Sequence, residues 1–406
     1  MKRVHYGWII VGVGVLVKMA GLGFGRFAYS MLLPSMRESL GFNYIEMGLL
    51  SGGILLGYLL FSLISGMLAT RFGSKRIIIA SLLCSSLSMF SISQFSGFFS
   101  LLFFTFAMGA GAAGAHISMT TLPMVWFGKR VLGRAVGIIA GGTGLGIVIT
   151  GFLLPALLLS WGKEAWRECW IFMALITFVV ALGSFILLKE RPGQRDPYSV
   201  ETSEKKEVHL SKMKEDGMSL RSIFLVYFIF GFAYIIYATY FVAFLVEEIH
   251  LPEKTAGNIW AIFGWMCMVS GLIWGFLSDR LGRRRALLWN NGVISLALIL
   301  PLCFHQVFLL GISTFLFGFT FLGTVAIIAA SIGDQVGEKR ASVYGLLTLI
   351  HGIGQFLGTT FGGYLKDVTG SFQITLLCSL VGCLLCFSLT AFDKSRKGGI
   401  FSHSNI

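Results

Sequence analysis

Twelve apolar runs, each long enough to cross a bilayer as a helix, constrain the fold of this sequence more than any other feature. A membrane-spanning helix needs about 20 predominantly apolar residues, and it satisfies every backbone polar group within its own segment. The runs lie near residues 6–36, 47–69, 77–94, 98–122, 132–160, 166–188, 222–247, 255–277, 286–304, 307–332, 341–366 and 372–392. They predict an all-α membrane protein with twelve transmembrane helices.

Composition excludes the main soluble classes of protein. Apolar and aromatic residues make up 55% of the 406 residues, and charged residues make up only 13%. A typical soluble domain carries about 25% charged residues, so this chain lacks the polar surface of a soluble enzyme or a disordered protein. The net charge of +13 would suit nucleic-acid binding only if the basic residues formed one patch, and here they are spread over loops. We therefore expect no nucleic-acid partner.

The lysine and arginine residues are divided very unequally between alternate loops. Of the 32, 25 lie on one side together with both chain ends, whereas five lie on the other side and two lie inside the first helix. Cytoplasmic loops of membrane proteins carry the excess of basic residues. We therefore predict a multi-pass protein of the cell (plasma or inner) membrane with both termini and the central loop in the cytoplasm.

The two halves of the sequence repeat each other. Residues 66–76 (GMLATRFGSKR) follow the second run, and residues 275–285 (GFLSDRLGRRR) follow the eighth run at an offset of 209 residues. The same offset relates the glycine pairs Gly48 and Gly257, Gly109 and Gly318, Gly114 and Gly323, and Gly128 and Gly337. Parallel repeats with a binding site between them are a known plan of secondary transporters. We predict two pseudo-symmetric six-helix bundles, residues 1–189 and 221–406, joined by a cytoplasmic linker at 190–220.

The repeated loop carries a family resemblance. The pattern G-x-x-x-D-R-x-G-R-R-R at 275–285, with its degenerate copy at 66–76, resembles the loop signature of the major facilitator superfamily. Residues 5–8 (HYGW) and 126–137 resemble the branch of monocarboxylate and oxalate–formate porters. The resemblance implies a transporter that works by rocker-switch alternating access and needs no cofactor or metal. No zinc-protease, P-loop or nucleophile-elbow motif occurs in the sequence, so we do not expect an enzyme.

The resemblance also implies a conformational latch in the repeated loops, which forms when the cytoplasmic side is closed. Its expected members are Gly66, Arg71, Gly73, Arg76, Gly275, Asp279, Arg280, Gly282, Arg284 and Arg285. A carboxylate at a helix end can accept hydrogen bonds from the free N–H groups of a neighbouring helix start. Thr70 replaces the aspartate in the first copy, so the two latches are expected to be unequal. The alternative is that these basic residues only set the topology.

Two cationic side chains, Lys18 and Arg26, lie inside the first helix, and no carboxylate lies in the middle of any predicted span. A charge near the bilayer centre costs at least about 2.5–3.5 kcal/mol, so both side chains are expected to face the protein interior or an aqueous cavity. Purely cationic buried charge favours an anionic substrate and disfavours organic cations. The alternatives are that Lys18 extends to the membrane surface and that Arg26 bonds backbone carbonyl groups.

Several further polar side chains, Tyr29 on the first helix and the others on different helices, could complete a substrate site. The candidates are Tyr29, His116, Tyr234, Tyr237, His351 and Gln355. Tyrosine hydroxyls and the glutamine amide suit a carboxylate or hydroxyl ligand, and either histidine could carry a proton near neutral pH. Packing inside the helical core is the alternative role for the histidines and tyrosines.

The favoured interpretation is a secondary transporter of a small, monocarboxylate-like organic anion, monomeric in the bilayer, with protons as a further transported partner. An efflux or sugar carrier of the same fold is the first alternative. A membrane sensor that binds its ligand without net flux is the second.

Overall fold

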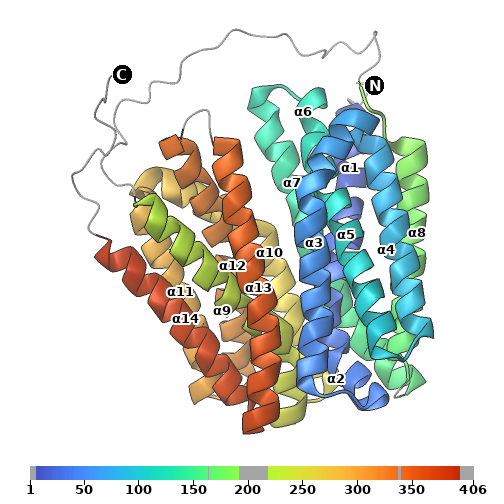
Figure 1. The fold of residues 1–406 in the computed structure, drawn as a ribbon, viewed down its shortest axis with the longest axis vertical. Helices are drawn as coiled ribbons and strands as arrows, with labels where there is room; N and C mark the ends of the chain where they lie inside the picture. Colours follow the sequence, from blue (N-terminus) through green and yellow to red (C-terminus); the bar gives the residue numbers. More distant parts are fainter. Residues whose placement is uncertain (1–5, 163, 192–217, 337–339, 394–406) are drawn as a thin grey trace.

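The computed structural model describes residues 6–162, 164–191, 218–336 and 340–393, and Figure 1 shows these as two helical bundles side by side. The N-terminal half contains α1 (Tyr6–Lys18), η1 (Met19–Phe27), α2 (Ala28–Leu40), α3 (Tyr44–Phe72), α4 (Ser74–Gln94), α5 (Phe98–Thr121), α6 (Pro123–Trp126), α7 (Lys129–Trp161) and α8 (Trp166–Leu187). The C-terminal half contains α9 (Leu220–Ala243), η2 (Phe244–Glu248), α10 (Glu253–Leu281), α11 (Arg283–Cys303), α12 (Val307–Val336), α13 (Arg340–Thr369) and α14 (Phe372–Phe392).

The predicted all-α membrane fold is confirmed. Eleven helical segments of the described chain are long and apolar enough to cross a membrane. The twelfth long helix, α13, has 30 residues and is therefore about 45 Å long, which also suffices for a span. The predicted linker at 190–220 lies mostly outside the described residues, so the domain boundaries stay predictions. Within the described chain, α8 ends at Leu187 and α9 begins at Leu220.

The 209-residue repeat is visible in the helix boundaries. α3, α4 and α5 begin at residues 44, 74 and 98, and α10, α11 and α12 begin 209 residues later, at 253, 283 and 307. The turn between the paired helices has a glycine with positive φ in each half, Gly73 at 91° and Gly282 at 86°. Side chains avoid this backbone conformation, which explains why glycine stands at both positions. Gly128 and Gly337 cannot be compared in this way, because Gly337 lies outside the described residues.

Equivalent glycines also make equivalent helix contacts. Gly109 on α5 packs against the carbonyl oxygen of Ile54, and a Cβ at Gly318 on α12 would lie 2.8 Å from the carbonyl oxygen of Phe263, again 209 residues later. Small residues let transmembrane helices approach this closely. The two halves are therefore built on the same internal contacts as well as on the same helix order.

The first membrane-spanning segment is continuous from Tyr6 to Leu40, but its middle part, η1, is a π-helix. This part packs tightly on α7, because a Cβ at Gly23 would lie 2.6 Å from the Cα of Gly146. π-helical turns are rare and occur often at functional sites. Lys18 ends α1 directly before the π-helical segment, and Arg26 lies within it.

The two halves meet along two long contacts, α7 with α10 and α3 with α13, and α2 also touches α9. Glycines line the first contact, where Gly144 packs against Gly264 and Gly151 against Gly257. In the second contact, a Cβ at Gly48 would lie 2.6 Å from the carbonyl oxygen of Thr359. Glycines at these contacts let the helices of the two halves approach closely.

Candidate substrate site

Arg26 connects the two halves near the middle of the molecule. Its Nη2 donates hydrogen bonds to the hydroxyl of Tyr234 on α9 and to Oε1 of Gln355 on α13, each at 2.9 Å. The amide Nε2 of Gln355 in turn donates to the Tyr234 hydroxyl at 2.8 Å. The structure therefore brings together three of the residues that the sequence proposed separately.

Two donor hydrogens of this cluster have no acceptor in the described part of the chain. The Tyr234 oxygen accepts from both Arg26 and Gln355, so its own O–H hydrogen has no acceptor within the described chain. The Nε–H group of Arg26 is buried and also lacks a hydrogen-bond partner there. The guanidinium carbon lies 5.3 Å from the centre of the Tyr58 ring, which adds a cation–π contact. Both free hydrogens are donors, and they suit an acceptor with negative charge.

A small cavity of about 10 Å³ adjoins Arg26 between the two halves. Its lining residues are Arg26, Phe27, Ser30, Ser51, Ile54, Leu55, Ile235, Ala238 and Thr239. This volume is about that of one water molecule, so the site is too narrow for an organic anion in this conformation.

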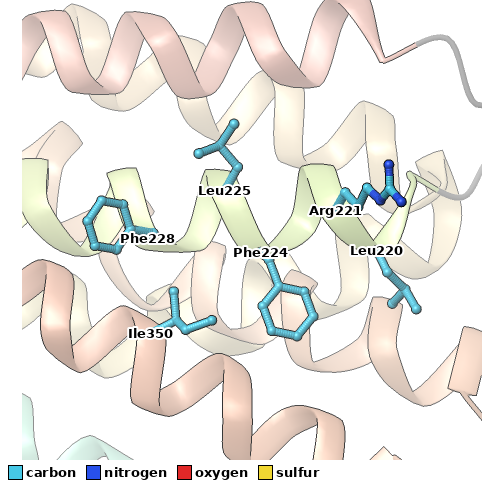
Figure 2. Close-up of a pocket in the computed structure, with 6 residues that line it drawn as sticks. All are labelled: Leu220, Arg221, Phe224, Leu225, Phe228 and Ile350. Carbon is cyan, nitrogen blue, oxygen red and sulfur yellow. The ribbon is translucent and has the colours of Figure 1, made fainter.

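A larger groove of about 570 Å³ lies elsewhere, along α9 and α13, and Figure 2 shows its side chains. It is lined by Leu220, Arg221, Phe224, Leu225, Phe228 and Ile350. Arg221 is its single polar side chain, at the start of α9. Binding sites for small polar ligands need several converging polar groups, which this groove does not offer.

Lys18 has a different environment from Arg26. Its Nζ lies 2.7 Å from Nδ1 of His116 and donates to the His116 carbonyl oxygen at 3.2 Å and to the Thr120 hydroxyl at 2.9 Å. The lysine is only 4% exposed, and its three hydrogen-bonding partners all lie on α5 within the N-terminal half. The Tyr58 ring contacts both groups, because its centre lies 5.3 Å from the Arg26 guanidinium carbon and 6.1 Å from the centre of the His116 ring.

His351 and Tyr29, two further predicted site residues, bond to groups other than Arg26. The His351 ring stacks on Tyr227 at 4.1 Å and on Tyr234 at 5.7 Å, and its Nδ1 lies 2.9 Å from the Tyr227 carbonyl oxygen. The Tyr29 hydroxyl donates to the Met47 carbonyl oxygen at 2.7 Å.

On the same face of α9 as Tyr234, Tyr237 bonds to a different partner. Its hydroxyl lies 2.9 Å from that of Ser313 on α12. His351 thus borders the Arg26 cluster, whereas Tyr29 and Tyr237 make bonds within their own halves.

In the C-terminal copy of the repeated loop, the contacts of Arg280, Arg283 and Arg284 lie within their own half. Arg283 binds the carboxylates of Asp279 at 2.5 Å and of Asp334 at 2.8 Å. Arg284 donates to the carbonyl oxygens of Thr390 and Ala391, at the end of α14, and Arg280 lies over the Phe276 ring. The sequence interpretation assigned no role to Arg283 or Asp334. Arg283 is the second basic residue of the motif, and this position is the signal that could have indicated it.

The N-terminal copy is arranged differently. The carboxylate of Glu190 accepts hydrogen bonds from the backbone N–H groups of Ser74 at 2.6 Å and Lys75 at 2.9 Å, the start of α4. Arg71 lies over the Phe72 ring, Arg76 is exposed, and a Cβ at Gly66 or at Gly275 would meet open space. The expected capping of a helix start by a carboxylate therefore exists here, but Glu190, which the sequence interpretation missed, supplies it.

Polar bonds between the halves occur at the opposite end, where α3 begins and α13 ends, which is the lower end in Figure 1. We call this the Asp367 end. The Asp367 carboxylate accepts hydrogen bonds from the backbone N–H groups of Tyr44 at 2.9 Å and Ile45 at 2.7 Å. Glu247 binds Arg37 at 3.5 Å and accepts from the Tyr44 hydroxyl. The sequence interpretation did not identify these contacts.

Comparison with known proteins places this architecture in a family. A family model described as the uncharacterised MFS-type transporter YbfB matches residues 18–391, nearly the whole chain. The chain belongs to this family of major facilitator superfamily transporters. The predicted superfamily is thereby confirmed, and the protein is a multi-pass membrane transporter and not an enzyme. The monocarboxylate branch stays a prediction.

Individual relatives of this transporter include three with named substrates. The chain is 24% identical to the hexuronate transporter of Bacillus subtilis, covering 90% of this chain and 89% of that one. It is 25% identical to the probable nitrate/nitrite antiporter NarK1 of Thermus thermophilus, covering 73% and 66%. It is 23% identical to the probable sulfoacetate transporter SauU of Cupriavidus necator, covering 95% and 92%.

A solved structure also shares the fold. The inward-facing bacterial homologue of the human lysosomal transporter Spinster superposes with a TM-score of 0.79 at 16% identity, covering 98% of this chain and all of that one.

Proposed function

We propose that this transporter carries a small organic anion across the cell membrane by alternating access, with Arg26 as the residue that binds the negative charge. The observation that carries the proposal is the position of Arg26 between the halves, where its Nε–H and the Tyr234 O–H are free to donate. Arg26 and Lys18 supply buried positive charge, and the described carboxylates lie at helix ends or in loops. An anion is the ligand that stabilises such a site.

The relatives support the same substrate class. Hexuronate, nitrate, nitrite and sulfoacetate are all anions whose charge is carried by oxygen atoms. The three relatives are about equally similar to this chain, at 23–25% sequence identity, so similarity does not favour one of these substrates over the others. The shared chemistry supports an oxygen-bearing anion, and a monocarboxylate is one member of that class.

The geometry suggests how binding and movement are linked. In this conformation Arg26 bonds to Tyr234 and Gln355 of the other half, and the halves are also joined at the Asp367 end. An anion beside Arg26 would compete for the same donors and would change the contact between the halves. From the distribution of basic residues we infer that the Asp367 end faces outward and that both termini are cytoplasmic.

Proton coupling fits the pair formed by Lys18 and His116. A proton added to Nδ1 of His116 would place two cations 2.7 Å apart, which is unfavourable in a buried site. An anion bound beside Arg26 would add negative charge nearby and reduce this cost. We therefore propose that a proton enters this pair together with the substrate.

Thermal stability of the purified transporter tests the proposal. The panel contains D-glucuronate, nitrate, sulfoacetate and L-lactate, with glucose and choline as neutral and cationic comparisons. An anion present at 100 times its Kd should stabilise the folded form by about 2.7 kcal/mol. Arg26→Gln should lose this effect, and Arg134→Gln, which changes an exposed arginine outside the site, should keep it. Stabilisation by choline or glucose alone would refute the anion proposal.

A further inference from the structure

The small cavity beside Arg26 contains hydroxyl groups with no hydrogen-bond partner in the described part of the chain. Ser51 on α3 is 7% exposed and Thr239 on α9 is 2% exposed, and the structure gives neither hydroxyl a hydrogen bond there. Ser30, in the same cavity, donates to the Ala238 carbonyl oxygen at 2.6 Å. Two hydroxyl-bearing side chains that line one cavity and have no protein partner are free to bond a ligand there.

Arg26 also lines this cavity, and its buried Nε–H has no hydrogen-bond partner in the described part of the chain. The cavity therefore presents one guanidinium donor and two hydroxyls, and its lining contains no carboxylate. The other walls are apolar or aromatic, from Phe27, Ile54, Leu55 and Ile235. An apolar surround strengthens hydrogen bonds to a charged ligand. Donors of this kind around one positive charge match the oxygen atoms of an oxyanion.

The two hydroxyls come from opposite halves of the transporter. Ser51 and Arg26 belong to the N-terminal half, and Thr239 belongs to the C-terminal half. At about 10 Å³ the cavity must widen before it holds a carboxylate, nitrate or sulfonate group. A bound oxyanion would therefore contact both halves at once, and their separation would determine how many donors reach it.

We propose that this cavity is the subsite for the charged head of the substrate, a carboxylate, nitrate or sulfonate group bound by Arg26, Ser51 and Thr239. The inference rests on the proposed anion transport and adds the residues that determine head-group recognition. Tyr234 and Gln355 hold the arginine through its Nη2 group, and the Nε–H keeps no partner in the described part of the chain. The rest of the substrate lies outside this subsite.

Binding measurements on conservative variants test the subsite. The probe is whichever of D-glucuronate, nitrate, sulfoacetate and L-lactate stabilises the unmodified transporter. Ser51→Ala and Thr239→Val each remove one hydroxyl at nearly constant volume, and Thr239→Ser restores it. Each loss should weaken binding at least about tenfold, the effect of one hydrogen bond to a charged group, whereas Thr239→Ser should bind within about threefold. Arg26→Lys keeps the charge but lacks the Nε–H, so it should also bind at least about tenfold more weakly.

Two control variants remove buried hydroxyls that are bonded within their own helices. Ser65→Ala changes α3 again, where the hydroxyl donates to the Ser62 carbonyl oxygen at 3.2 Å. Thr150→Val changes α7, where the hydroxyl donates to the Ile147 carbonyl oxygen at 3.0 Å. Both should bind the probe like the unmodified transporter. Melting temperatures without ligand show which variants are folded, and the pair of Thr239 variants remains informative if Ser51→Ala is unstable.

The outcomes separate this inference from the proposed function. If Arg26→Gln loses binding while Ser51→Ala and Thr239→Val match the controls, the anion site stands and this subsite is wrong. If no anion stabilises the unmodified transporter, the proposed function fails and the subsite fails with it. Selective weakening in Ser51→Ala and Thr239→Val supports both.

Discussion

Replacing Asp367 with asparagine should release the bond that holds the two halves together where α3 begins. The carboxylate accepts from the backbone N–H groups of Tyr44 and Ile45 at 2.9 and 2.7 Å, and it comes from α13 in the other half. These are the first N–H groups of α3, which have no partner inside the helix. The aspartate thus stabilises a helix start only while the halves are closed at this end.

The size of the effect follows from these two bonds. A hydrogen bond to a charged group contributes about 1.5–3 kcal/mol, and a negative charge at a helix start adds about 0.3–1 kcal/mol. Asp367 is exposed, so water competes for its oxygens, and the asparagine keeps one carbonyl oxygen. We expect a loss of about 1–2 kcal/mol from the closed state. That corresponds to a shift of about 5- to 30-fold toward states open at the Asp367 end.

Distances between spin labels measure this shift directly. Labels at residues 97 and 306, in loops of opposite halves at the Asp367 end, are placed in a background without the seven native cysteines. Asp367→Asn should increase the population with long distances. Asp334→Asn, which removes a carboxylate that binds Arg283 within one half, should leave the distribution unchanged. An unchanged distribution in Asp367→Asn, or an equal change in both variants, would refute the reasoning.

Three further predictions concern helix packing and the repeated loops. Gly109→Ala places a Cβ against the carbonyl oxygen of Ile54 and should cost about 1–3 kcal/mol, seen as a lower melting temperature; an unchanged value would contradict the close contact. Asp279→Asn should impair transport more than Thr70→Ala, because Asp279 pairs with an arginine whereas Thr70 bonds within its own helix. Equal transport rates of the two variants would count against an unequal pair of latches. Glu190→Gln removes the charged cap of α4 and should lower the free energy of unfolding by about 0.5–2 kcal/mol. An unchanged melting temperature in thermal unfolding would contradict this prediction.

The sequence predicted the fold well because the relevant signals are local or repeated. Apolar length sets the number of spans, and the 209-residue offset recurs in the helix starts at 44 and 253 and in the paired turns of Gly73 and Gly282. The π-helical form of η1 was not predicted, since hydrophobic periodicity over only nine residues cannot separate it from an α-helix.

The site was predicted only in part because its members meet across the interface between halves. The position of a charged side chain inside a membrane span indicated Arg26, but its pairing with Tyr234 and Gln355 depends on how the halves are placed together. Asp367 was missed for the same reason, as it lies 323 residues from Tyr44, its partner. Ser51 carried no signal in the sequence, because one serine in an apolar helix is an ordinary packing residue.

Exchange of labelled substrate across a membrane tests the central claim that Arg26 holds an anion during transport. Proteoliposomes are loaded with an unlabelled anion that stabilises the transporter, and uptake of the same anion in labelled form is followed. The unmodified transporter and Arg134→Gln should accumulate the label, and Arg26→Gln should not. Accumulation by Arg26→Gln at the unmodified rate would contradict the account, as would an unmodified protein that binds the anion without exchanging it, which would be the behaviour of a sensor.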